Sequence, residues 1–70
     1  MTKVYIAQNS RNYVIGVFSS KARAQKMALD YLGNGAELVF KGKSFEEYSG
    51  QEDYVKITYE NLNSNYYEAY

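Results

Sequence analysis

Four acidic residues are the first candidates for chemistry in this 70-residue sequence, and they form the adjacent pairs Glu46–Glu47 and Glu52–Asp53. General acid–base catalysis needs two carboxyl groups that converge in space and have separated pKa values, which adjacency in the chain does not supply. The spacing also differs from the D-x-D-x-D-G pattern of a calcium-binding loop. We therefore interpret both pairs as parts of a solvated acidic loop.

Two residue types with catalytic and metal-binding chemistry are missing, because the sequence contains neither His nor Cys. This removes the commonest general base, the commonest metal ligand and any thiolate site. No glycine-rich phosphate loop and no nucleophile elbow occurs either. The sequence therefore predicts a protein that is not an enzyme, with no catalytic residue, no cofactor and no metal site.

The longest ordered pattern runs from an apolar strand into a helix. Residues Tyr13–Phe18 are β-branched or aromatic except for one glycine, which favours a strand, and apolar residues on both faces indicate a central position. Ser19 or Ser20 then serves as N-cap, and the helix is expected from about Ser20 to Leu32, ending at Gly33. One helix face collects the residues expected to pack on a sheet: Ala24, Met27, Ala28 and Tyr31, with Leu32 at its edge.

Three further segments alternate between apolar and polar residues and are predicted strands: Lys3–Ala7, Ala36–Lys43 and Tyr54–Glu60. In the second of these, Leu38 and Phe40 are expected on one face. Ser44-Phe45-Glu46-Glu47 matches a capping box, S-x-x-E, which predicts a short helical turn from Phe45 to Tyr48. The predicted fold is α+β, ββαββ: a four-stranded, mostly antiparallel sheet with one helix on one face.

The last residues differ in composition from the rest. We expect residues 1–61 to form a single domain and residues 62–70 to form a tyrosine-rich C-terminal tail. An isolated segment of this length cannot hold a helix by itself. Two interpretations of the tail remain: it folds back on the sheet, or it is disordered until it binds a partner.

Residues Val4 to Leu32 carry a resemblance to known sequences. The segment Ile15-Gly16-Val17-Phe18-Ser19-Ser20-Lys21 and the Ala-rich helix after it resemble small uncharacterised domains of bacteria and their phages. The resemblance implies a strand-strand-helix start and a phage or mobile-element origin. It implies no activity that could be assigned to individual residues.

Size and charge suggest self-association. A chain this short without a disulfide buries little apolar surface, so we expect a homodimer, formed through a strand edge or the Leu29 flank of the helix. Residues 1–43 hold seven basic and two acidic residues, whereas residues 44–70 hold one basic and six acidic. Either the two halves neutralise each other in the fold, or the molecule has a basic and an acidic face. No apolar run is long enough to span a membrane and no signal peptide is recognised, which predicts a cytoplasmic protein.

Protein binding is the function that these features favour, because tyrosine is enriched in interfaces. The expected contact residues are Leu29, Tyr66, Tyr67 and Tyr70. By analogy with the phage resemblance, the partner is expected to be a host factor, such as a defence protein, that this chain inhibits. The alternative is single-stranded nucleic-acid binding through a sheet face with Lys41, Lys43, Tyr54 and Lys56, although a pI of about 6.2 argues against it.

Overall fold

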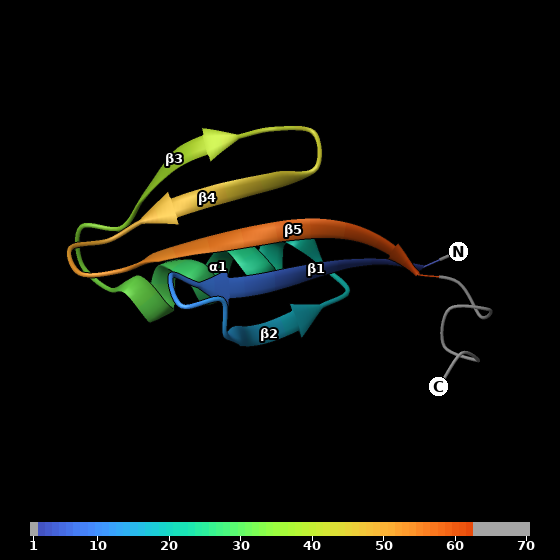
Figure 1. Cartoon of the computed structure of the whole chain (residues 1–70), viewed down its shortest axis with the longest axis horizontal. Coiled ribbons are helices and arrows are strands. Elements are labelled where there is room, and N and C mark those ends of the chain that lie inside the picture. Colours follow the sequence, from blue (N-terminus) through green and yellow to red (C-terminus); the bar gives the residue numbers. More distant parts are fainter. Residues whose placement is uncertain (1, 63–70) are drawn as a thin grey trace.

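The structure, a computed structural model, describes residues 2–62 and confirms the α+β class with a single helix on one face of the sheet (Figure 1). The described strands make one antiparallel sheet of five strands in the order β2-β1-β5-β4-β3. The elements in chain order are β1 Thr2–Asn9, β2 Val14–Phe18, α1 Lys21–Leu32, β3 Glu37–Lys41, β4 Phe45–Ser49 and β5 Tyr54–Leu62.

Helix α1 has the boundaries that its capping residues predict. The Ser20 hydroxyl accepts a hydrogen bond from the Arg23 amide at 3.4 Å, which satisfies one free N–H of the first turn. Gly33 ends the helix with φ +77°, and its N–H donates to the Leu29 carbonyl at 2.9 Å. Ala24 and Ala28 are fully buried, so their small side chains let α1 lie close to the sheet.

The predicted helical turn from Phe45 to Tyr48 is wrong, because this segment is strand β4. The capping box is present in sequence, but Glu46 and Tyr48 alternate with Phe45 and Glu47, and both are buried beneath α1. The pairing of this segment with β3 and β5 therefore outweighs the helical preference of the capping-box pattern. The acidic-loop interpretation also fails for Glu46, which is fully buried.

The predicted central position of the Tyr13–Phe18 strand is wrong as well, because β2 forms one edge of the sheet. Both edge strands carry an irregularity in their pairing: β2 opposite Ala7 and Gln8 of β1, and β3 between Leu38 and Phe40. The irregularity in β3 breaks the expected alternation, since Leu38 lies opposite the buried Tyr48 and Phe40 opposite Glu47. Irregularities of this kind discourage an edge strand from pairing with another chain.

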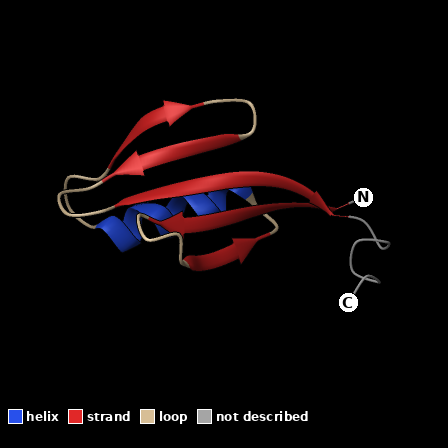
Figure 2. Cartoon of the chain, in the orientation of Figure 1, coloured by secondary structure: helices blue, strands red, loops and turns tan. Residues whose placement is uncertain are grey.

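The two faces of the sheet have different surroundings. Helix α1 contacts β1, β2, β4 and β5 from one side, as Figure 2 shows. The main cluster of buried residues lies there and is small: Ala7, Ala24, Ala28, Tyr48, Val55 and Ile57. Val4 is buried too, but it pairs with Glu60 and lies on the opposite side of the sheet. No element within residues 2–62 covers the opposite side, which we call the open face. At 12 residues, α1 falls short of the length and apolarity that a membrane-crossing helix needs, and residues 2–62 hold no other helix.

Candidate functional site

The first site with unusual chemistry is the buried carboxylate of Glu46. Strand β4 places it under α1, where its Oε2 accepts hydrogen bonds from the Tyr48 hydroxyl at 2.5 Å and the Gln25 amide at 3.0 Å. The Tyr59 hydroxyl donates to Oε1, and Lys21 Nζ lies 3.7 Å from the same oxygen. The carboxylate thus joins α1, β4 and β5, and the Lys21 ammonium also lies 4.9 Å from the centre of the Tyr59 ring.

These contacts keep the carboxylate charged. Burial alone would raise the pKa of Glu46, but the hydrogen bonds from Tyr48, Tyr59 and Gln25 and the charge of Lys21 outweigh it and hold that pKa below 4.5. Burial and the neighbouring carboxylate raise the pKa of Tyr59 to about 12, and they raise the pKa of Tyr48 as well. All three groups therefore keep fixed protonation states near neutral pH.

This cluster serves the fold. Glu46 has no exposed surface and its oxygens are occupied by partners from three elements, so no substrate can reach it. A buried charge with its hydrogen bonds satisfied fixes the position of α1 over the sheet. Within residues 2–62 no group of three or more acidic side chains is arranged to hold a metal ion.

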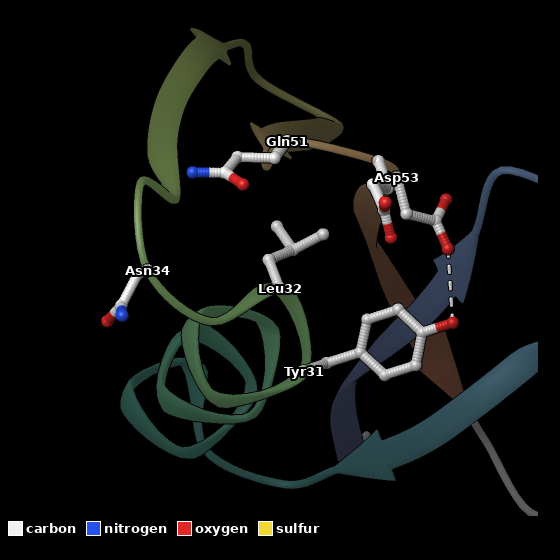
Figure 3. Close-up of a pocket in the computed structure, with 6 residues that line it drawn as sticks. Tyr31, Leu32, Asn34, Gln51 and Asp53 are labelled. Atoms are coloured by element: carbon white, nitrogen blue, oxygen red, sulfur yellow. Dashed lines mark hydrogen bonds between the residues drawn. The ribbon is translucent and has the colours of Figure 1, made fainter.

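A pocket of about 480 Å³ lies where the end of α1 meets the loop between β4 and β5 (Figure 3). Its lining is Tyr31, Leu32, Asn34, Gln51, Glu52 and Asp53. The Asp53 carboxylate accepts hydrogen bonds from the Tyr31 hydroxyl at 3.1 Å, the Ser10 amide at 3.2 Å and the Tyr54 amide at 2.8 Å. Hydrogen bonds from Ser10, Tyr54 and Tyr31 lower the pKa of Asp53. This carboxylate therefore ties the loop to the turn that follows β1 and to α1.

The third candidate is an uncharged stripe on the open face. Side chains of paired residues point to the same side of a sheet, so the pairs Ile6–Val17, Ile6–Thr58 and Phe45–Thr58 form a continuous row. Phe40 of β3 continues it, because its ring stacks on Phe45 with centroids 5.0 Å apart. The open-face stripe thus crosses every strand of the sheet and consists of Val17, Ile6, Thr58, Phe45 and Phe40.

The ends of the stripe are the most exposed. Val17 is 57% exposed and Phe40 48%, whereas Ile6, Thr58 and Phe45 are half-buried between them. Lys56 lies beside the stripe with its ammonium 5.3 Å from the centre of the Phe45 ring. This contact places a cation at the margin of the stripe, against the face of an aromatic ring.

The structure separates the predicted protein-contact residues. Leu29 is 42% exposed on α1, on the opposite side of the sheet from the stripe. It follows Gln25 by one helical turn and therefore lies on the flank directed toward β4. Tyr66, Tyr67 and Tyr70 lie outside the described residues.

The structure brings together only some of the residues predicted to bind nucleic acid. Tyr54 and Lys56 lie on opposite sides of Val55 in sequence, and both point to the open face. Lys41 is paired with the buried Glu46 and belongs to the other face, while Lys43 lies in the turn between β3 and β4. Glu47 is directly opposite Lys56, so an acidic group accompanies the cation on the open face.

Sequence reasoning missed the stripe itself. Ile6 and Val17 were visible as apolar strand residues, and their hydrophobic type is the signal that could have marked them. The capping-box pattern places Phe45 in a helical turn, and a row across the sheet needs Phe45 in a strand. Comparison of the chain with models of protein families, with curated proteins and with solved structures finds no match.

Proposed function

We propose that this protein is a non-catalytic protein-binding module and that the open-face stripe is its contact surface. One observation supports this most strongly: an uncharged row of side chains crosses the whole sheet on the side that no described element covers. Interface cores are depleted of charge and enriched in aromatic residues, and this row has both properties. The acidic partner of Lys56 and the separation of Lys41 weaken the case for nucleic acid.

The test compares one variant of the stripe with a matched variant elsewhere. Phe40→Lys places a charge in the stripe, whereas Leu29→Lys places the same charge on the exposed flank of α1. Each variant and the wild-type chain is immobilised and used to capture proteins from a nuclease-treated lysate, and the captured protein is then purified and its binding measured.

The proposal predicts a dissociation constant that rises at least about tenfold with Phe40→Lys and changes little with Leu29→Lys, because a charge buried at an interface core loses its water. Equal weakening by both variants would contradict the stripe as the contact surface. Capture that disappears after nuclease treatment would instead indicate nucleic-acid binding.

A further inference from the structure

The small core leaves this chain with apolar surface that it does not bury by itself. Half of the six core residues are alanines, and the largest fully buried side chains are Ile57, Glu46 and Val55, one of which is charged. The chain has no disulfide to compensate. Domains of this size gain stability by burying a further surface in an oligomer. A second copy of the chain can cover this apolar surface, because it is present wherever the chain itself is present.

The edges of the sheet are poorly suited to this contact. Both β2 and β3 have irregular pairing, and β3 begins and ends with charged residues, Glu37 and Lys41. These are two of the devices that stop edge strands from pairing. The open face remains, and two sheets that pack face to face at a separation of about 10 Å form a common two-layer arrangement.

Charges on either side of the stripe define how two copies would meet. Thr58 is the stripe residue of β5, and Lys56 and Glu60 lie two residues before and after it, about 7 Å away in each direction. Both point to the open face, since residues two apart on a strand share a side. Lys56 and Glu60 are therefore placed symmetrically about the stripe, and Glu47 of β4 lies beside Lys56.

We propose that the protein forms a symmetric dimer in which the open-face stripe packs on the stripe of a second copy. This inference rests on the proposed function and names its partner. The two-fold axis runs along the stripe, between the two sheets and perpendicular to β5. That axis leaves each stripe residue facing its own counterpart and exchanges the positions of Lys56 and Glu60.

Two identical ion pairs follow from this symmetry. Lys56 of each copy faces Glu60 of the second copy at the margin of the contact, in addition to the Glu47 that lies opposite Lys56 within its own sheet. An axis along the strands would place Lys56 against Lys56 and Glu60 against Glu60 instead. Because like charges at close range oppose association, the pattern of charge selects the first axis.

The test uses two charge-reversal variants, measured by sedimentation velocity separately and mixed. In Glu60→Lys, every expected ion pair becomes a contact between two lysines, and in Lys56→Glu every pair becomes a contact between two glutamates. We expect each variant alone to have a dimer dissociation constant at least about tenfold higher than wild type. An equimolar mixture of the two should form a heterodimer, because each lysine then faces a glutamate. Circular dichroism confirms that each variant is folded.

The variants measured alone test the axis, because an axis along the strands already opposes like charges in wild type and would leave the single variants no weaker. The mixture separates the effect of charge from a loss of stability. Any general loss of stability weakens both variants and cannot be restored by mixing them, whereas a complementary pair must recover. Variants that dimerise as well as wild type, or a mixture that fails to recover, would overturn the inference. A monomeric wild-type chain would do so too, and if a chain ending at Leu62 then dimerised, residues 63–70 would be identified as the occupant of the stripe.

These outcomes are separable from the proposed function. A monomeric wild-type chain that still captures another protein through Phe40 leaves the binding module in place and removes only the dimer. If the wild-type chain is monomeric and Phe40→Lys does not change which proteins it captures, both the dimer and the proposed binding function are contradicted.

Discussion

The carboxylate of Glu46 joins α1 to the sheet. It accepts hydrogen bonds from Tyr48, Tyr59 and Gln25 and lies near the ammonium of Lys21. Hydrogen bonds to a charged group stabilise a fold by more than neutral ones, and leaving a buried partner unsatisfied costs more than the bond contributes. The contribution of this one side chain is therefore measurable against its neighbour Glu47.

We expect Glu46→Gln to lower the free energy of unfolding by about 1–3 kcal/mol, because the neutral amide loses the charge-assisted bonds from both tyrosines. Glu47→Gln is the matched control: it changes the adjacent residue in the same way, and Glu47 lies on the open face with part of its side chain exposed. Its effect should stay within about 0.5 kcal/mol. Urea denaturation of both variants measures the difference, and equal losses would show that Glu46 contributes nothing specific.

The dependence of stability on pH provides a second prediction. The pKa of Glu46 in the folded chain is lowered from 4.5, so its stabilisation is present above that pH and is lost as pH falls below it. The difference in stability between wild type and Glu46→Gln should therefore shrink progressively below pH 4.5. The pKa of Tyr59 is raised from 10.0 to about 12, so stability should also fall between those values as pH rises. Denaturation curves collected across both ranges test this, and a constant difference in acid would contradict it.

Glu46 could not be placed from sequence for a physical reason. Adjacent glutamates after a serine look like a solvated helix start, and the groups that compensate the buried charge come from positions 2, 13 and 21 residues away. Only the folded sheet brings Tyr59 and Gln25 to the same carboxylate. The helical turn that the sequence predicts at Phe45 also conceals the open-face stripe, because the stripe requires Phe45 to be part of a strand.

Among the secondary structure elements, α1 is the one that sequence predicts best. Its N-cap at Ser20, its end at Gly33 and its buried alanines are all local or periodic signals, and the structure confirms each. Tyr31, expected on the same face, is instead 43% exposed. Strand β2 shows the limit of such signals. A continuous apolar run is typical of a central strand, yet β2 lies at an edge with Val14 and Val17 more than half exposed.

The packing of α1 can be tested with one substitution at two positions. Ala28→Asp introduces a carboxylate at a fully buried position, so we expect a loss of several kcal/mol or failure to fold. Ala22→Asp places the same group on exposed surface in the first turn, where the helix dipole favours a negative charge, and stability should change by less than about 1 kcal/mol. Thermal melting of the two proteins compares them, and similar melting temperatures would mean that the face assigned to the sheet is wrong.

For the whole molecule, the charge asymmetry of the sequence is partly resolved within the fold. The ion pair found in residues 2–62 joins Lys21 from the basic half to Glu46 from the acidic half. The central pairing of β1 with β5 also brings the first and last described segments together. One ion pair thus joins the two halves, whereas the pairs of β1 with β5 bring no opposite charges together. The uncharged stripe remains without a covering element among residues 2–62.

The most direct measurement of that central claim is an isotope-filtered nuclear Overhauser experiment on a mixture of labelled and unlabelled protein, which detects only contacts between copies. We predict intermolecular contacts among Ile6, Val17 and the rings of Phe40 and Phe45, each mainly with its own counterpart. Intermolecular contacts from Leu29 or Leu38, which lie on the other side of the sheet, would contradict the open-face stripe as the surface through which this protein binds.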